Sequence, residues 1–492
     1  MFGRLSRRSV VGLALGTAAS AVVAACGAPT PTAAPPKPTE APKPAAPVAA
    51  PAATKPAEVA KPTEAPKPAA PAETKPAEAA KPTEAAKPAA PAAAPAAAAK
   101  PGVDMVLWIA DFDEPLKKTV DGDLIPGLKT AFGHNVKPDY VGYDNLTQKI
   151  LTAYAGGVLA DSLVVGAAWP TPLIARGVTR DLTDYIKKWG QKDDFYPASW
   201  ETSWKGKDYG VPIWTAPRTM LYRKDFMQEA GLSADKPPIQ WDELTAAAVK
   251  MTKREGDVIK VAGFNTTTSW QHFIIFLWQA GGDFFTADGT KTTFNSPEGE
   301  AALQFMSDFF DKHKVVDKKG MASPQPNQGA FVANAVASEV NNMSILAAMK
   351  QFNAAKLDQV LVAPPLMKAK QVSSAWTGSF IVNAKAKNPD AAWEIVQHFT
   401  GPENMLKYNQ SWQFVSPRNS LKGKGYQSDP NTTKFADILD KYGKALPQSP
   451  IWLDMRIGLG NMCDDALFGK KTIKQSLADY AKEADTKLAE FK

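Results

Sequence analysis

The distribution of proline and aromatic residues divides this 492-residue chain into two parts that cannot fold in the same way. Between Pro29 and Pro101 lie 20 of the 41 prolines, residues 27–101 hold no Phe, Trp or Tyr, and all 13 tryptophans come later. A segment without large apolar side chains cannot bury enough surface to offset the entropy lost on folding. The composition therefore predicts a disordered linker up to residue 101 and a folded body over residues 102–492.

The net charge of +7 belongs mostly to the first part. Residues 1–101 carry 12 Lys or Arg against 6 Glu, whereas the remaining 391 residues are nearly balanced, with 45 basic and 44 acidic side chains. Binding to nucleic acid requires clustered basic side chains that neutralise phosphates. The balanced body therefore argues against nucleic acid as a partner.

The first 25 residues are typical of a secretory signal peptide. Basic side chains at Arg4, Arg7 and Arg8 precede an apolar run, Val10–Ala25. This run is shorter than the roughly 20 residues that a membrane-spanning helix needs. Ser6–Val11 also resembles a twin-arginine export motif, which would carry a folded protein across the membrane. The sequence leaves both export routes open.

The small residues at the end of this run, Val23-Ala-Ala-Cys26, resemble the lipobox of bacterial lipoproteins, in which the cysteine receives lipid and becomes the new N-terminus. The resemblance implies that residues 1–25 are removed. It also implies that Cys26 anchors the protein to the membrane, at the extracytoplasmic face of the cell envelope. The alternative is an ordinary signal peptide that contains a cysteine. If Cys26 carries lipid, Cys463 has no disulfide partner, and we expect a buried apolar role for it.

Residues 26–101 comprise the lipidated N-terminus and the disordered Pro/Ala/Lys/Glu linker, which contains a repeat. The run Lys37–Pro47 recurs at residues 61–71 and, with Ala86 in place of a proline, at residues 81–91. These repeats have no large side chain to bury, so they are typical of an extended spacer and not of a solenoid. We expect a tether that lets the body move above the membrane.

Short apolar runs and amphipathic segments alternate at the start of the body. Met105–Ile109, His134–Val141 and Ser162–Val165 have the composition of buried strands. Leu124–Phe132 and Asp144–Ala155 have apolar residues at helical spacing. The alternation predicts an α/β fold with parallel strands. Further helices are expected at Asp242–Thr252, Phe273–Ala280, Pro297–Lys312, Ala391–Thr400 and Ile473–Leu488.

Four groups of motifs, in order along the body, resemble the extracellular solute-binding proteins of ABC importers, in the carbohydrate-binding branch that includes maltose-binding protein. The strongest group joins Gly210–Ile213 to Met220–Phe226 and Pro237–Leu244, with Arg223 where the family usually has asparagine. The other groups are Ala160–Val165 with Leu173–Val178, Trp376–Ile381 with Asn388–Glu394, and Ser416–Arg418 with Pro450–Trp452. Ala335–Glu339 matches the family less well.

The resemblance implies a two-lobed periplasmic-binding-protein (Venus-flytrap) fold with a hinge that the chain crosses three times. By motif placement, lobe I covers about 102–214 and 377–438, and lobe II covers about 215–376 and 439–492. The ligand would be held between the lobes, and their closure would present a new surface to the transmembrane subunits of an ABC permease. Affinity would then reflect how far the ligand favours the closed state.

Tryptophans in loops and at the expected crossings are the candidate ligand contacts. Sugars present flat C–H faces and a rim of hydroxyl groups, so their sites need aromatic surfaces with fixed donors and acceptors. Each such tryptophan has a structural alternative in the core or the hinge. The candidates are Trp169, Trp214, Trp270, Trp376, Trp412 and Trp452. Trp189, Trp241 and Trp393 lie in helical contexts, and we expect them in the core.

The polar candidates are Asp111 and Asp113 after the first strand, Arg218 after the first crossing, Asn341, and Ser379. An aspartate at a strand end is often only a helix cap. Two roles are possible for Arg218 as well. It would pair with a structural carboxylate or, if it faces the ligand, bind an acidic or hydroxyl-rich group in bidentate fashion.

Motifs for catalysis, metals and cofactors are missing from the sequence. The four histidines have no metal-ligand spacing, and neither a G-x-S-x-G elbow nor a glycine-rich nucleotide loop follows the strands. We therefore expect a binding protein without enzymatic activity, cofactor or metal, whose ligand is a mono- or oligosaccharide. Two alternatives remain. One is the same class with a peptide, polyol or phosphodiester ligand, and the other is a lipid-anchored glycan-degrading enzyme with paired carboxylates.

Overall fold

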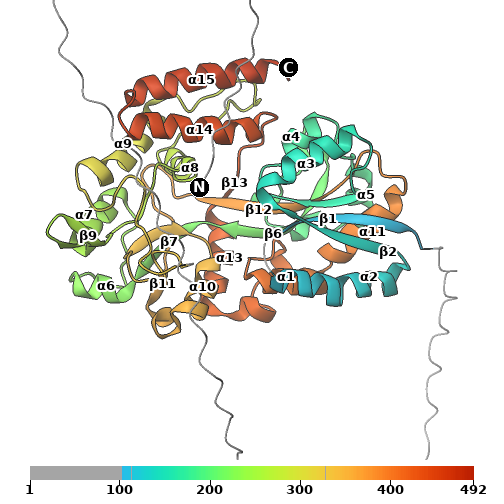
Figure 1. Cartoon of the computed structure of the whole chain (residues 1–492), viewed down its shortest axis with the longest axis horizontal. Helices are drawn as coiled ribbons and strands as arrows, with labels where there is room; N and C mark the ends of the chain where they lie inside the picture. The colour runs from blue at the N-terminus through green and yellow to red at the C-terminus, as the bar shows by residue number, and fades with distance from the viewer. Residues whose placement is uncertain (1–101, 112–113, 327, 492) are drawn as a thin grey trace, which may run out of the picture. The chain divides into compact units, whose positions relative to one another are not determined.

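The computed structural model describes residues 102–111, 114–326 and 328–491 (Figure 1). The predicted signal peptide, Cys26 and the linker lie outside these residues, as does Asp113. In the described part of the chain, no helix combines the length and the apolar character needed to cross a bilayer.

A mixed sheet of six strands organises the N-terminal portion of the described chain. β1 (Asp104–Asp111) pairs in parallel with β2 (Asn135–Gly142) and with β3 (Ser162–Val165), so the three predicted strands and their orientation are confirmed. β12 pairs antiparallel with both β3 and β6, and β13 lies beside the start of β12. These three strands are β6 (Gly210–Pro217), β12 (Ser373–Val382) and β13 (Gly443–Ala445).

Helices cover both faces of this sheet, and the alternation of side chains along β1 shows why its sequence is apolar throughout. Leu107 and Ile109 enter one core, and Trp108 and Ala110 enter the core on the opposite face. The first core is closed by α1 (Glu114–Thr119), α2 (Ile125–Phe132), α5 (Thr183–Trp189), α11 (Pro389–Thr400) and α12 (Pro402–Trp412). The second is closed by α3 (Tyr143–Ala155) and α4 (Pro170–Ala175).

The second lobe is built around a small antiparallel sheet in the order β10–β7–β11. Its core is rich in aromatic side chains, and Phe273, Phe276 and Trp278 of α8 are buried in it. The strands are β7 (Thr219–Arg223), β10 (Ser338–Asn341) and β11 (Val360–Val362). The helices are α6 (Lys224–Glu229), α7 (Trp241–Met251), α8 (Trp270–Gln279), α9 (Pro297–Asp311), α10 (Ser344–Phe352), α14 (Trp452–Leu467) and α15 (Ile473–Ala489).

Smaller elements complete the described chain. Two hairpins pair β4 (Ser203–Trp204) with β5 (Lys207–Asp208) and β8 (Lys253–Glu255) with β9 (Val258–Val261). A π-helical turn, Val120–Leu124, joins α1 to α2. Short 3-10 segments occupy Lys192–Asp194, Pro197–Ser199, Ala354–Gln359, Asn419–Leu421 and Gly425–Ser428.

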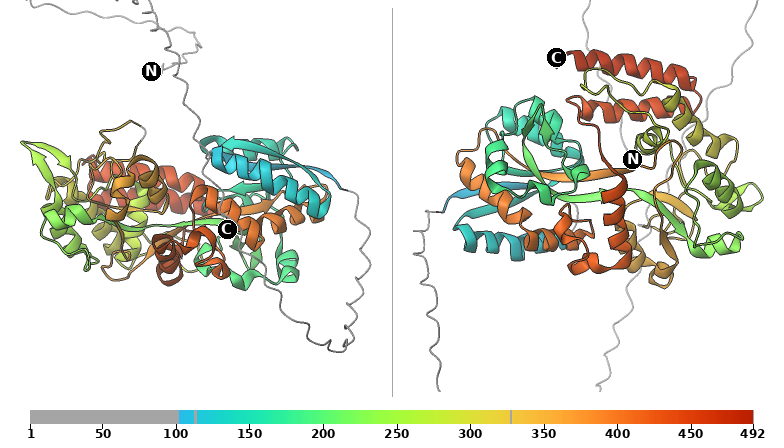
Figure 2. Two further views of the ribbon diagram at one scale, coloured as in Figure 1. Left: turned by 90° about the horizontal axis from the view of Figure 1, so that it is seen from below. Right: turned by 180° about the vertical axis from the view of Figure 1, so that it is seen from behind.

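The chain passes between the two sheets along β6, β12 and β13. β6 continues through Arg218 into β7 of the second sheet, and β12 returns beside it in antiparallel register, with Trp376 opposite Ala216. Figure 1 and the right view of Figure 2 show this pair of strands, green and orange, running through the middle of the folded part. Within the described residues the chain therefore passes between the lobes three times, as the resemblance implied.

The exact lobe boundaries stay a prediction. The range 377–438 was expected in lobe I, but α13 (Pro430–Tyr442) straddles its end. Its apolar side chains Phe435, Ala436, Ile438 and Leu439 pack in the same core as β7 and α8. This helix therefore lies at the junction of the lobes, where a boundary in the sequence has little physical meaning.

The predicted helices and core positions are largely confirmed. α8 is buried because its side chains are apolar nearly all round, and Gly281 after it has φ 102°, the left-handed conformation expected at a helix end. Trp241, Trp393 and Cys463 are buried, and Trp189 is partly buried against Phe195 and Trp393.

Close packing in the crossing strands depends on Gly378 of β12. A Cβ atom at this position would lie 2.1 Å from Nε1 of Trp214 on β6, so only glycine lets the indole lie on the backbone. The ring of Trp214 also contacts Phe414 at 5.0 Å between centroids. The two crossing strands are thus joined by an indole as well as by their hydrogen bonds.

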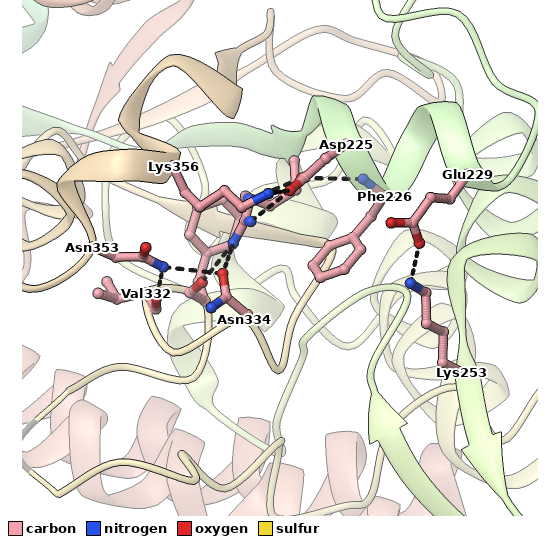
Figure 3. Close-up of polar contacts among 10 residues, drawn as sticks. Asp225, Phe226, Glu229, Lys253, Val332, Asn334, Asn353 and Lys356 are labelled. Atoms are coloured by element: carbon pink, nitrogen blue, oxygen red, sulfur yellow. Dashed lines mark hydrogen bonds and ion pairs between the residues drawn. The ribbon is translucent and has the colours of Figure 1, made fainter.

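Arg223, the departure from the family pattern, is 1% exposed and forms a network at the end of β7. Its Nε and Nη2 donate to the two carboxylate oxygens of Asp225 at 3.1 and 2.8 Å, and Nη1 donates to Oδ1 of Asn334 at 2.7 Å. Figure 3 shows Lys356 approaching Asp225 as well, and Asn353 beside Asn334. Burial tends to raise the pKa of Asp225, but hydrogen bonds from Arg223 and Lys356 outweigh it and lower that pKa.

Replacing Asp225 should therefore destabilise the fold. Asp225→Ala leaves a buried guanidinium without its carboxylate, which is expected to cost about 3–5 kcal/mol in the free energy of unfolding, measured by urea denaturation. The matched control is Glu229→Ala, which breaks the exposed ion pair between Glu229 and Lys253 in the same region (Figure 3) and should cost less than about 1 kcal/mol. Equal losses in the two variants would contradict this account of Arg223.

Glu201 is a fully buried carboxyl group that joins two segments at the junction of the lobes. It accepts hydrogen bonds from the backbone N–H of Ala168, before α4, at 2.7 Å and of Leu446, after β13, at 3.3 Å. Burial raises the pKa of Glu201 to about 8, although the two N–H donors oppose this. The carboxyl group is therefore expected to hold a proton at neutral pH.

This pKa predicts a stability that falls with rising pH. The folded protein keeps the proton of Glu201 up to about pH 8, whereas the unfolded chain releases it near pH 4.3, so stability is lost as the pH rises between these values, by up to about 1.4 kcal/mol per pH unit. The variant Glu201→Gln should lack this contribution to the pH dependence of the free energy of unfolding. Urea unfolding of the wild type and the variant at pH 5 to 8 tests this prediction. The contributions of the other titrating groups cancel when the two free energies of unfolding are subtracted at each pH. Parallel curves would rule out a protonated Glu201.

Candidate functional site

Four aromatic residues from both lobes and a crossing strand meet at the junction of the two sheets. Trp270 starts α8, and its ring lies 5.7 Å from that of Trp376 on β12, centroid to centroid. On the lobe I side, Trp169 precedes α4 and packs at 4.7 Å against Tyr143, the first residue of α3. Tyr143, Trp270 and Trp376 are partly exposed and present aromatic surface, whereas Trp169 is 2% exposed and packs against Tyr143.

Two arginines connect these rings. The guanidinium carbon of Arg456 on α14 lies 5.9 Å from the ring centre of Trp169 and 6.0 Å from that of Trp270, so it bridges the lobes. The guanidinium carbon of Arg218 lies 4.5 Å from the ring centre of Trp376. Arg218 Nη1 also donates to Oε1 of Gln271 at 2.8 Å.

Burial lowers the pKa of Arg218 to about 10, against the opposing effects of Tyr143 and Glu339. The guanidinium therefore stays charged at neutral pH. Contacts between neighbouring rings and guanidinium groups thus link Tyr143, Trp169, Arg456, Trp270, Trp376 and Arg218 in that order.

Glu339 of β10 supplies a carboxyl group to this region. It is 8% exposed, and its oxygens accept hydrogen bonds from Nδ2 of Asn341 at 2.7 Å and of Asn265 at 3.3 Å. Burial raises the pKa of Glu339, although these amides and Arg218 oppose the shift. The amides fix the orientation of a carboxyl group that is not paired directly with a cation.

His272 lies two residues after Trp270 on α8 and is neutral at pH 7. Burial and the nearby charge of Arg218 lower its pKa to about 4. Its Nδ1 is within hydrogen-bond distance of Thr266 Oγ1, at 3.0 Å, and accepts from the N–H of Thr267. No group of three or more His, Cys, Asp or Glu side chains suited to a metal ion occurs in the described residues.

Of the residues predicted from sequence, the structure brings together Trp169, Arg218, Trp270, Asn341 and Trp376, through the contacts given above. Trp452 is entirely buried behind Trp270, with their rings edge to face at 5.8 Å. Ligand contact by any of these residues stays a prediction.

The remaining predicted residues lie elsewhere or are described only in part. Trp214 is buried against Gly378 and Phe414, and Ser379 is buried within β12. Asp111 is the last residue of β1 and Trp412 the last of α12, but the side chains of both lie outside the described atoms, as does the whole of Asp113.

Sequence reasoning missed Tyr143, Gln271, Glu339 and Arg456. Tyr143 directly follows β2, and ligands in α/β folds bind beyond the carboxyl ends of parallel strands, so its position was a usable signal. Arg456 lies four residues after Trp452, on the same face of α14. Gln271 and Glu339 had no comparable signal, since contact with Arg218 arises only in the folded chain.

Comparison with known proteins agrees with this architecture. The family described as bacterial extracellular solute-binding protein matches residues 112–406. A binding protein of Brucella abortus (strain 2308) is 25% identical over 397 residues, which cover 76% of this chain and 88% of that protein.

Solved structures share the fold. An ABC transporter solute-binding protein from Thermotoga lettingae TMO, bound with α-D-tagatose, is 22% identical with a TM-score of 0.69, over 79% of this chain and all of that one. The GacH receptor of Streptomyces glaucescens, solved unliganded and with acarbose, is 22% identical with a TM-score of 0.68, over 80% of this chain and all of that one. Because the family match covers more than half of the 492 residues, the chain belongs to the bacterial extracellular solute-binding proteins, with a periplasmic-binding-protein fold.

Proposed function

We propose that this protein is the substrate-binding subunit of an ABC importer and that it captures a carbohydrate between its two lobes. The observation that carries the proposal is the cluster of Trp169, Trp270 and Trp376 with Arg218 and Arg456, contributed by both lobes and by the crossing strand β12. Two proteins of similar fold are described as binding tagatose and acarbose, which supports a sugar ligand.

The chemistry of the cluster fits the surface of a sugar. Indole rings offer flat apolar faces for the C–H groups, and Gln271 and Asn341 offer polar groups for hydroxyls. Peptides and polyols lack such extended flat faces, so the partly exposed rings of Trp270 and Trp376 favour carbohydrate over them.

Capture would couple binding to closure of the lobes. Arg456 reaches aromatic rings on both sides of the junction, so a ligand held there contacts both lobes only when they are together. Such a ligand shifts the equilibrium towards the closed state by as much as it prefers that state. The closed form would then be the one that an ABC permease accepts.

Anchoring at the membrane completes the proposal. A lipid on Cys26 and the repeat-containing linker to residue 101 would hold the body at the extracytoplasmic face, within reach of the permease. Export by the twin-arginine or the general secretory route is compatible with this arrangement.

Binding without hydrolysis is favoured by the chemistry of the carboxyl groups. Glycoside hydrolysis normally uses two carboxyl groups that flank the scissile bond. Among the described residues, Glu339 is the carboxyl group coupled to Arg218, and amides of Asn265 and Asn341 occupy its oxygens.

A panel of saccharides tests the proposed function. The melting temperature of the purified protein should rise with at least one saccharide, because a ligand that binds only the folded state stabilises it, by about 2.7 kcal/mol at 100 times the Kd. Amino acids and peptides should leave it unchanged. Stabilisation by peptides alone would overturn the carbohydrate ligand, and release of new reducing ends would overturn the binding-protein class.

Alanine substitutions of Trp270 and Trp452 should have different effects, the first on ligand affinity and the second on the stability of the fold. Trp270→Ala removes a partly buried ring and is expected to weaken saccharide binding roughly tenfold, or about 1.4 kcal/mol, by calorimetric titration. The matched control Trp452→Ala empties a fully buried site and should lower the free energy of unfolding by about 3–5 kcal/mol. Unchanged affinity in Trp270→Ala would assign that ring to the core.

A further inference from the structure

Arg218 has an unused hydrogen-bonding edge. Its Nη1 donates to Gln271, and its guanidinium faces Trp376, but its Nε is buried with no hydrogen-bond partner in the described residues. Its Nη2 forms no hydrogen bond there either, and no carboxylate of the described residues lies within 4.0 Å of the guanidinium. The Nε–Nη2 edge is the side on which arginine binds a carboxylate in bidentate fashion.

Two arginines of the described chain that are more deeply buried than Arg218 show what this position lacks. Arg223, 1% exposed, binds Asp225 through Nε and Nη2. Arg418, 2% exposed, binds Asp194 at 2.8 Å. Buried charges in folded proteins are normally paired, because desolvation without a partner is costly. Arg218 is therefore a cation prepared for a partner that comes from outside the described residues.

The described residues near Arg218 include a second arginine that no described carboxylate pairs with. Arg456 forms no salt bridge with a described residue, and it lies against Trp270, which in turn contacts Trp376 beside Arg218. His272 is neutral, and burial favours the protonated form of Glu339. The N-terminus of α8, at Trp270 and Gln271, adds the positive end of a helix dipole.

We propose, resting on the carbohydrate-binding function above, that the natural ligand is a saccharide with a carboxylate group, as in uronic acids. The Nε–Nη2 edge of Arg218 receives the carboxylate, Arg456 adds a second positive charge, and the partly exposed rings of Trp270 and Trp376 contact the sugar ring. A neutral sugar would leave the guanidinium of Arg218 without a paired carboxylate among the ligand and the described residues when the lobes close. An acidic sugar supplies the counter-charge, so closure is favoured for it specifically.

Matched pairs of ligands test this proposal. Calorimetric titration of the purified protein should compare D-galacturonate with D-galactose, D-glucuronate with D-glucose, and trigalacturonate with its neutral methyl ester. We expect at least tenfold tighter binding of the acidic member in one or more pairs, with affinity that falls as salt increases. Equal or tighter binding of the neutral members would overturn the acidic ligand and leave the carbohydrate function standing. Failure of every neutral and acidic saccharide to bind would overturn both.

Substitutions of the two arginines test which side chain binds the carboxylate of the ligand. Arg218→Gln should weaken binding of the acidic saccharide at least tenfold and change binding of the neutral member less than threefold. Arg456→Gln provides a second test at a partly buried site, independent of how well Arg218→Gln folds. The control Arg254→Gln, at an exposed position on β8, should bind both as the wild type does. Equal losses for acidic and neutral ligands in both site variants would make these arginines general supports and overturn the assignment.

Discussion

The antiparallel pairing of β6 with β12 is the interaction on which the rest of the structure depends. Seven residue pairs, from Ala375 opposite Pro217 to Ile381 opposite Gly210, join these strands along the passage between lobes. The same pairing fixes Arg218 at the end of β6 and Trp376 on β12 next to each other. The connection between the lobes therefore also assembles the centre of the candidate site.

Around this pair of strands, each lobe contributes aromatic rings that are held in place by its own core. Trp270 is held by the buried helix α8 and backed by Trp452, while Trp169 is held by α4 and by Tyr143. Rings held from behind in this way keep their faces in place without a ligand, which lowers the entropic cost of binding. Apolar packing therefore supports the rings from behind, whereas the charged side chains Arg218 and Arg456 lie at the junction of the lobes.

The fold could be predicted from sequence because its signals are local. The apolar run of β1, the helical spacing in α3 and the glycine after α8 each reflect interactions within a few residues. The site could be predicted only in part. Trp270 and Trp376, which are partly exposed, stood out by residue type, but the same criterion selected Trp169, Trp214 and Trp452, which are buried. Whether a ring is buried depends on residues from elsewhere in the chain that pack against it, as Gly378 packs against Trp214. The periodicity of the sequence around the ring does not contain this information.

Gly378 has a consequence for how such a protein can diversify. A side chain at that position would force the indole of Trp214 off the backbone and separate β6 from β12, so the passage between lobes tolerates little change. Trp270 and Arg456, by contrast, lie on α8 and α14, outside the hydrogen-bonded pair of strands, although Trp270 still contacts Trp376 on β12. A lineage carrying this scaffold is thus free to acquire new ligands by altering helix residues, while the mechanics of closure are inherited unchanged.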